Sequence, residues 1–280
     1  MTSFGIILFA GSVLYLVVKF WRSDRRAGFP VHGWLGLGIP AVAAVLWRWD
    51  VPLVKFFLTP IVWTGYVLAL DATVSCVRGR SLITTAPSAF AWMALLSIPL
   101  WLIFEAYNLR LQNWRYVGLP ESVVLRVVGY LWSFATIWPA VLETADFLLA
   151  TGAWRGSSRD RSRVWMVAGA LMLVAPVVAP ARWGAYLFGL VWVGFAFLLD
   201  RGGVPVRALC VAGILCGFIW EFWNYWAGAR WVYVFPILQS LKIFEMPLPG
   251  YLGFPAFAVE VFVMYGFATR ALQLPYYEVR

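Results

Sequence analysis

The sequence predicts an all-α integral membrane protein with about nine transmembrane helices. Hydrophobic residues make up 62% of the 280 residues and charged residues only 12%, whereas about a quarter of the residues of a soluble domain are charged. Apolar runs near the roughly 20 residues that a membrane-spanning helix needs recur from end to end. They are apolar on every face, which favours helices over the alternating strands of a membrane barrel.

The expected spans follow one another along the whole chain. They lie at residues 4–21, 33–47, 54–71, 86–107, 134–153, 164–180, 183–200, 204–226 and 252–269. The second run is short and Pro40 interrupts it, so a bundle of eight spans stays open. No strand is expected, and therefore no phosphate-binding loop that follows a strand.

Two halves of the chain repeat one another. The segment FEAYNLRLQNWRY at Phe104 recurs as WEFWNYWAGARWVY at Trp220, and WTGYVLALD at Trp63 recurs as WVGFAFLLD at Trp192. The pattern predicts an N-terminal helix with a basic loop at 1–30, a four-helix repeat at 31–155 and a second at 156–280. An even number of helices makes the two repeats parallel, related by an axis along the membrane normal.

The basic residues predict the orientation. Cytoplasmic loops are enriched in Lys and Arg, and an outside N-terminus leaves 14 of the 22 basic residues on the inner side. We therefore expect a cell-membrane protein with its N-terminus outside and its C-terminus in the cytoplasm. This topology accounts for the net charge of +9 without a nucleic-acid partner. The basic segment RGSSRDRSR at Arg155 is expected to link the repeats at the inner surface and to contact anionic headgroups.

Four carboxylic acids and two nearby amides lie in or at the ends of the apolar segments. They are Glu105, Asn108 and Glu143 in the first repeat, and Glu221, Asn224 and Glu260 in the second. Acids inside a membrane are costly and usually functional. Each Asn follows a Glu by three residues, which places amide and acid on one helical face. The predicted depths would let the two acids of each repeat meet in the outer half of the bilayer.

The other titratable residues narrow the chemistry. His32 is the only histidine and the cysteines form no CxxC pair, so we expect neither a metal nor a cofactor. A buried Glu resists ionisation and can act as a general acid, while a hydrogen-bonded neighbour stays ionised as the base. Alternatively, each Glu is structural and bonds to the following interfacial loop or to an Arg such as Arg230. Asp71 and Asp200 are interpreted as solvated helix ends, and Asp146 as a residue without a counterpart in the other repeat.

Aromatic residues are unusually frequent, with 18 Trp, 21 Phe and 12 Tyr. Interfacial belts account for many of them. Others crowd around Glu221, where their faces could stabilise a carbocation. The expected substrate-binding residues are Trp220, Trp223, Tyr225, Trp231 and Tyr233, with Trp114 and Tyr116 in the first repeat.

The order of these residues resembles that of the integral-membrane lycopene cyclases, a family of small duplicated proteins. The segments WEFWNYW, RWVY and GYLGFPAFAVE carry the resemblance. It implies a site built from Glu221, Asn224, Tyr225, Trp231, Tyr233, Pro255 and Glu260. The chain departs from the family in having a single Glu after Pro255 and four expected spans in each repeat.

The leading hypothesis is an intramembrane acid–base enzyme, a lycopene cyclase-like isomerase that protonates a long isoprenoid or carotenoid polyene to cyclise or isomerise it. Glu221 and Glu260 would be acid and base, and Asn224 would orient Glu221. One alternative is a non-enzymatic membrane subunit, a lipid- or pigment-binding scaffold in a homo- or hetero-oligomer. A proton-coupled transporter is the other. The expected partners are membrane lipid or a hydrophobic polyene.

Overall fold

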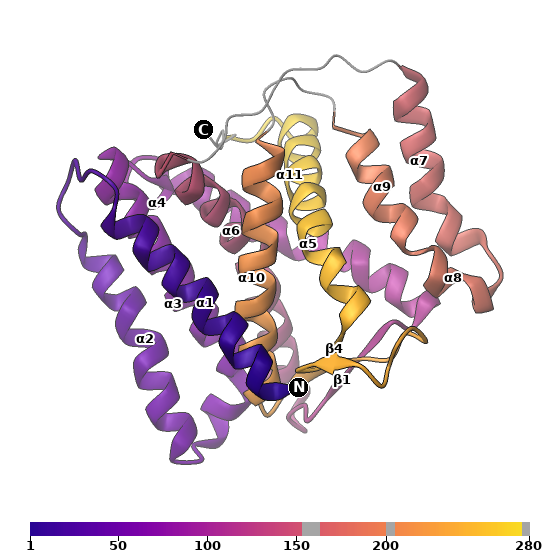
Figure 1. The fold of residues 1–280 in the computed structure, drawn as a ribbon, viewed down its shortest axis with the longest axis horizontal. Coiled ribbons are helices and arrows are strands. Elements are labelled where there is room, and N and C mark those ends of the chain that lie inside the picture. Colours follow the sequence, from indigo (N-terminus) through magenta and orange to yellow (C-terminus); the bar gives the residue numbers. More distant parts are fainter. Residues whose placement is uncertain (153–162, 200–204, 276–280) are drawn as a thin grey trace.

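The computed structural model describes residues 1–152, 163–199 and 205–275, and helices dominate them (Figure 1). Seven helices in these ranges are long and apolar enough to cross a membrane. They are α1 (Thr2–Trp21), α2 (Val31–Arg48), α3 (Pro52–Arg78), α5 (Pro87–Leu111), α6 (Val123–Ala150), α10 (Val206–Trp226) and α11 (Gly253–Ala271). The shorter helices are α4 (Leu82–Thr85), α7 (Arg163–Val178), α8 (Ala181–Leu187) and α9 (Gly189–Phe197). The predicted linker at Arg155 and the residue Asp200 lie outside the described residues.

The predicted count of nine long spans is wrong for the described residues. All nine expected runs contain helix, but the run at 164–180 gives only the 16 residues of α7. The run at 183–200 is divided between α8 and α9. Proline explains where α7 and α8 separate, because Pro180 is the N-cap of α8 and a proline cannot continue the hydrogen bonding of a preceding helix.

A two-stranded ribbon joins the two halves, so the expectation of no strands is also wrong. Strand β1 (Trp114–Val117) pairs antiparallel with β2 (Arg230–Tyr233), and Arg115 lies opposite Val232. A two-fold rotation about an axis through the centre of the Arg115–Val232 pair exchanges Trp114 with Trp231. The paired strands are thus the two copies of the repeated Trp-x-Tyr segment. A second pair, β3 (Lys242–Ile243) and β4 (Met246–Pro247), precedes the 3-10 helix η1 (Leu248–Leu252).

Glycine contacts recur in the two halves. A Cβ atom on Gly36 of α2 would lie 2.7 Å from the carbonyl oxygen of Gly65 in α3. A Cβ atom on Gly169 of α7 would lie 2.8 Å from the carbonyl oxygen of Gly194 in α9. Each helix pair therefore packs backbone against backbone, as small residues allow between apolar helices. The recurrence agrees with an internal duplication, whose boundaries at 31–155 and 156–280 stay a prediction.

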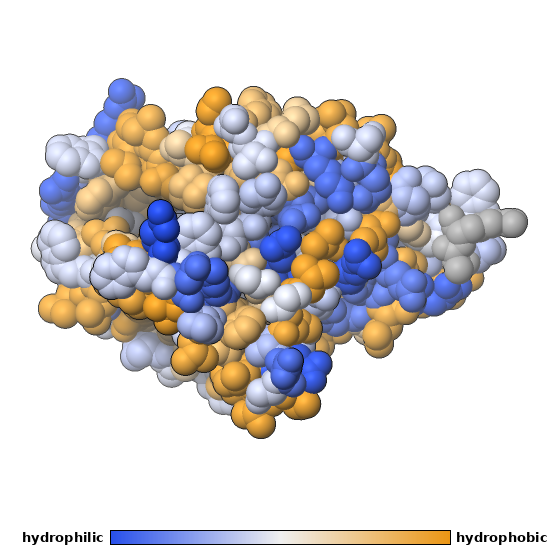
Figure 2. Space-filling model, turned by 90° about the horizontal axis from the view of Figure 1, so that it is seen from below, coloured by the Kyte–Doolittle hydropathy of each residue, from blue (hydrophilic) through white to orange (hydrophobic). Residues whose placement is uncertain are grey.

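The bundle has two distinct ends. The N-terminus lies at the end that carries β1 and β4, here called the ribbon end, and α11 runs away from it toward the opposite end (Figure 1). Figure 2 views the ribbon end, where hydrophilic residues run across the middle of the face between more hydrophobic margins. The bundle's sides carry exposed apolar residues such as Ile7, Leu14 and Leu171. The buried core lies mainly in α3, α6, α10 and α11.

Candidate functional site

A cavity of about 380 Å³ lies between the ribbon and the helices. This volume falls in the range of small-molecule sites. Its walls are mostly aromatic, and both halves of the chain contribute to them. The central rings are Trp63, Trp101, Phe134, Trp192, Trp220 and Phe257.

The walls on the two sides of the cavity use matching positions. Five lining residues of α3 have counterparts at the same spacing in α8 and α9. The first set is Phe56, Phe57, Thr59, Pro60 and Trp63, and the second is Ala185, Tyr186, Phe188, Gly189 and Trp192. In α3 the backbone leaves helical geometry at Phe57, with φ −105° and ψ 18°, three residues before Pro60. The kink is typical of a helix that contains proline.

Glu260 is the one carboxylic acid among the described residues that line this cavity. It belongs to α11, is 2% exposed, and its Oε1 atom has no hydrogen-bond partner. Nearby, the indole Nε1 of Trp138 donates to the carbonyl oxygen of Val261 at 2.9 Å and fixes α6 against α11. Buried carboxyl oxygens normally have partners, so a group that faces a cavity without one is available to a ligand.

Glu105 differs from Glu260, because one of its carboxyl oxygens accepts three hydrogen bonds, two of them from the ribbon. Its Oε1 accepts hydrogen bonds from the Tyr116 hydroxyl at 2.6 Å, the Trp101 indole at 2.9 Å and the Trp114 indole at 3.3 Å. Burial and the neighbouring Glu105 raise the pKa of Tyr116 well above its ordinary value. The tyrosine therefore stays protonated and keeps donating to the carboxylate.

Glu221 repeats this arrangement in the second half. Its Oε1 accepts from the Tyr233 hydroxyl at 3.1 Å and the Trp231 indole at 3.3 Å. Burial, followed by the charge of Glu221, raises the pKa of Tyr233 well above its ordinary value. The alternative in which the acid bonds to the following loop thus describes the geometry of both Glu105 and Glu221.

The two amides fasten the ribbon backbone to the helices. Asn224 donates to the Trp231 carbonyl at 2.9 Å and accepts from the Trp231 backbone N–H at 3.0 Å. Asn108 does the same with Trp114, at 2.9 and 3.1 Å. The expectation that Asn224 orients the Glu221 side chain stays a prediction, and the hydrogen bonds found for the amide are those to the backbone of Trp231.

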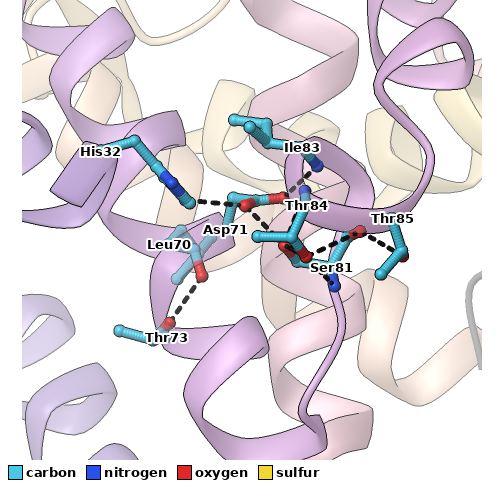
Figure 3. Close-up of polar contacts among 8 residues, drawn as sticks. All are labelled: His32, Leu70, Asp71, Thr73, Ser81, Ile83, Thr84 and Thr85. Carbon is cyan, nitrogen blue, oxygen red and sulfur yellow. Dashed lines mark hydrogen bonds and ion pairs between the residues drawn. The ribbon is translucent and has the colours of Figure 1, made fainter. Parts of the chain in front are cut away.

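Glu143 lies in a second polar cluster, at the end of the bundle opposite the ribbon. The centre of this cluster is Asp71, shown in Figure 3, which is fully buried. Asp71 accepts hydrogen bonds from the Ser81 hydroxyl at 2.7 Å and the Ile83 backbone N–H at 2.9 Å, and it contacts His32 Nε2 at 2.9 Å. The interpretation of Asp71 as a solvated helix end is therefore wrong, because the α4 turn folds over it.

The rest of this cluster also differs from the prediction. Glu143 is fully buried and lies beside Asp71. Asp146 forms an ion pair with Arg78 of α3. Glu143 interacts with Asp71 and Asp146 rather than with Glu105. The expected meeting of the two acids of the first repeat is therefore not found.

Most predicted substrate-binding residues do line the cavity: Trp114, Tyr116, Trp220, Trp231 and Tyr233. Trp223 and Tyr225 do not. Trp223 packs edge-on against Phe9 of α1, with ring centres 6.0 Å apart, and Tyr225 packs against Phe244 at 5.3 Å. The reason is that α1 and the turn between β3 and β4 cover the face of α10 that carries these two residues. The sequence did not predict this covering.

Sequence reasoning missed several lining residues. Trp63 and Trp192 carried a signal, because they occupy matching places in the repeated motif. Arg126 in α6 carried none. In residues 1–152, 163–199 and 205–275, no group of three His, Cys, Asp or Glu side chains is arranged to hold a metal ion.

The fold and the site define a class: an apolar helical bundle, with seven helices able by length and composition to cross a membrane, around an aromatic cavity that contains one carboxyl group. Comparisons of this chain with protein-family models, curated proteins and solved structures found no match.

Proposed function

We propose that this protein is an intramembrane enzyme that binds a long isoprenoid or carotenoid polyene in the aromatic cavity and isomerises or cyclises it, with Glu260 as the proton donor. It lies in the cell membrane with the ribbon end outside and the C-terminus in the cytoplasm. The observation that carries the proposal is the buried, unpartnered carboxyl oxygen of Glu260 at the wall of an aromatic cavity.

The chemistry needs one acid that works in both directions. Protonated Glu260 donates its proton to one carbon of a double bond, a C–H bond forms, and the positive charge stays on the neighbouring carbon. The Glu260 carboxylate then removes a proton from an adjacent carbon, which restores the acid and moves the double bond. If a second double bond attacks the cation first, a ring closes before the proton leaves. Composition and oxidation state do not change, so no redox partner is needed.

The aromatic wall supplies the stabilisation that a carbocation needs. Trp101, Trp220 and Phe257 line the cavity and pack against one another, with ring centres 5.8 to 6.4 Å apart. The face of an aromatic ring attracts a cation by about 2 kcal/mol or more when water is excluded. The same rings exclude water, which would otherwise capture the cation as an alcohol.

In this proposal the other acids have supporting roles. Glu105 and Glu221 hold the aromatic ribbon over the cavity, through Tyr116 and Tyr233. The sequence hypothesis of Glu221 and Glu260 as an acid–base pair therefore becomes a proposal in which Glu260 acts alone and Glu221 positions the wall.

The test uses Glu260→Gln in cells that accumulate linear polyenes, with the products separated by chromatography. Gln keeps the shape but cannot deliver a proton, so we expect the cyclised or isomerised product to fall at least a hundredfold. Glu121→Gln is the matched control, because Glu121 is exposed at the ribbon end and outside the cavity. Unchanged product in the Glu260 variant rules out the enzyme.

A second candidate is a non-enzymatic protein that holds a lipid or pigment. It is favoured by the observation that, among the described residues, Glu260 is the one acid that lines the cavity, while Glu105 and Glu221 each bond to the ribbon. Such a binder would carry an extractable polyene in equal amounts before and after the Glu260→Gln substitution, with the same structure in both. An enzyme would instead accumulate unreacted polyene in the variant.

A further inference from the structure

One cation in the cavity wall is left without an anion. Arg126 lies near the start of α6, at the ribbon end, and lines the cavity. Its Nε atom is buried and has no hydrogen-bond partner, and its guanidinium makes no ion pair in the part of the chain that the structure describes. Arg126 as a whole is partly exposed, but its buried Nε–H donor lacks an acceptor, which is costly. A ligand that brings an anion to this position would remove that cost.

The other arginine in the wall is already satisfied. Arg230 Nε donates to Glu245 at 3.2 Å, and its Nη1 donates to the Ala227 carbonyl at 3.4 Å. Among the described lining residues, the charged side chains are therefore Arg126, the neutralised Arg230, and Glu260.

Arg126 and Glu260 lie at different depths in the bundle. The Trp138 indole binds the backbone beside Glu260, so the distance along α6 from Arg126 to Trp138 measures their separation. It is about 18 Å, from a rise of 1.5 Å per residue. Tyr130, Phe134 and Ile137 line the cavity between them and share the Arg126 face of α6, because they follow at helical spacing. The wall is apolar and aromatic along this path.

We propose that the ligand is an isoprenoid lipid with a phosphate headgroup. The phosphate lies on Arg126, the chain follows the α6 wall inward, and the reacting double bond lies beside Glu260. A guanidinium group suits this head because it forms paired, charge-assisted hydrogen bonds with phosphate oxygens. The choice of an isoprenoid chain rests on the proposed function, whereas the anion site at Arg126 rests on the cavity alone. A bilayer phospholipid offers the same phosphate chemistry, so the test separates the two sources.

The test measures binding to purified full-length protein in nanodiscs of phosphatidylcholine, by quenching of Trp fluorescence. The probes are geranylgeranyl monophosphate, geranylgeraniol, phosphatidylglycerol and inorganic phosphate. We expect the monophosphate to bind tighter than the alcohol by roughly tenfold to a hundredfold, the range for a hydrogen bond to a charged group. Arg126→Gln should abolish that preference and leave the affinity for the alcohol unchanged. Arg115→Gln is the control, because Arg115 is exposed on β1 and outside the cavity.

The outcomes separate this inference from the proposed function. Equal affinities for the monophosphate and the alcohol in the wild-type protein overturn the inference. This comparison does not depend on whether the Arg126→Gln variant folds. A preference that survives Arg126→Gln overturns it too. Displacement of the monophosphate by equimolar phosphatidylglycerol, or by inorganic phosphate, assigns the site to those anions and overturns the isoprenoid ligand. If Glu260→Gln leaves the product unchanged while the Arg126-dependent preference holds, the proposed function alone fails.

Discussion

Replacing Asn224 with Ala removes both hydrogen bonds between its amide and the Trp231 backbone of the ribbon. The amide is fully buried and its bonds to Trp231 are 2.9 and 3.0 Å long, so water cannot easily replace them. Leaving a buried backbone N–H or C=O group unpaired costs about 1–3 kcal/mol. With two such groups on Trp231, we expect the free energy of unfolding to fall by about 2–6 kcal/mol.

The assay is unfolding of the detergent-solubilised protein in mixed micelles with a rising fraction of dodecyl sulfate, followed by Trp fluorescence. Amide hydrogen exchange of Trp231 gives a local measure, and its rate should rise in the same variant. Asn108→Ala is the matched comparison, because Asn108 makes the same two bonds to Trp114 but is only half-buried. Its cost should be smaller, since water can reach the freed groups.

Two results would refute this reasoning. One is an Asn224→Ala protein whose free energy of unfolding stays within about 0.5 kcal/mol of the wild type, the scatter of ordinary surface substitutions. The other is unchanged hydrogen exchange at Trp231 together with reduced product formation, the result expected if Asn224 oriented an acid instead of the ribbon.

Three further outcomes are expected. Folding raises the pKa of Tyr233. Its contribution to stability is therefore complete below the unfolded pKa of about 10 and is lost as pH rises through the folded pKa. Tyr233→Phe should remove this loss of stability at alkaline pH, measured as the free energy of unfolding against pH. Arg78→Gln leaves Asp146 buried without its ion pair and should cost about 3–5 kcal/mol, whereas Lys55→Gln, at an exposed pair, should cost under about 1 kcal/mol. Gly65→Ala places a methyl 2.5 Å from Pro40 Cδ and should destabilise by about 1–3 kcal/mol; Gly38→Ala, in open space on α2, should not lower the unfolding midpoint.

Local sequence patterns predicted the helices well because hydrophobic runs of this length have few other stable arrangements. They failed where the length of an unbroken helix decides whether a segment is long enough to cross a membrane. At 183–200 the composition is as apolar as elsewhere, but the helix breaks between Leu187 and Gly189. The ribbon was missed because four-residue strands have no strong pattern of their own. Each strand of the ribbon exists through its pairing with the other, across more than a hundred residues of chain.

The candidate site was predictable in kind and only partly in detail. The repeated motif identified Glu105 and Glu221 as equivalent, and the structure gives them equivalent hydrogen bonds to Tyr116 and Tyr233. The motif could not show that one oxygen of each acid is held by the ribbon, while Oε2 of Glu221 is buried without a partner. Glu260 differs because its position in α11 turns it toward the cavity, and nothing in its neighbouring residues signals that orientation.

Taken alone, the sequence determined the apolar helical character of this protein, its two matching halves and the inventory of acids and aromatic rings, because composition and spacing are properties of the chain itself. The tertiary structure decided which of these acids lines the cavity. Hydrogen-bond partners for Glu105, Asp71 and Asp146 come from segments that are distant in sequence or brought back by a turn. It also placed Arg126 and Glu260 in one cavity, since only the packing of α6 against α11 brings a cation and a carboxyl from separate halves to the same wall.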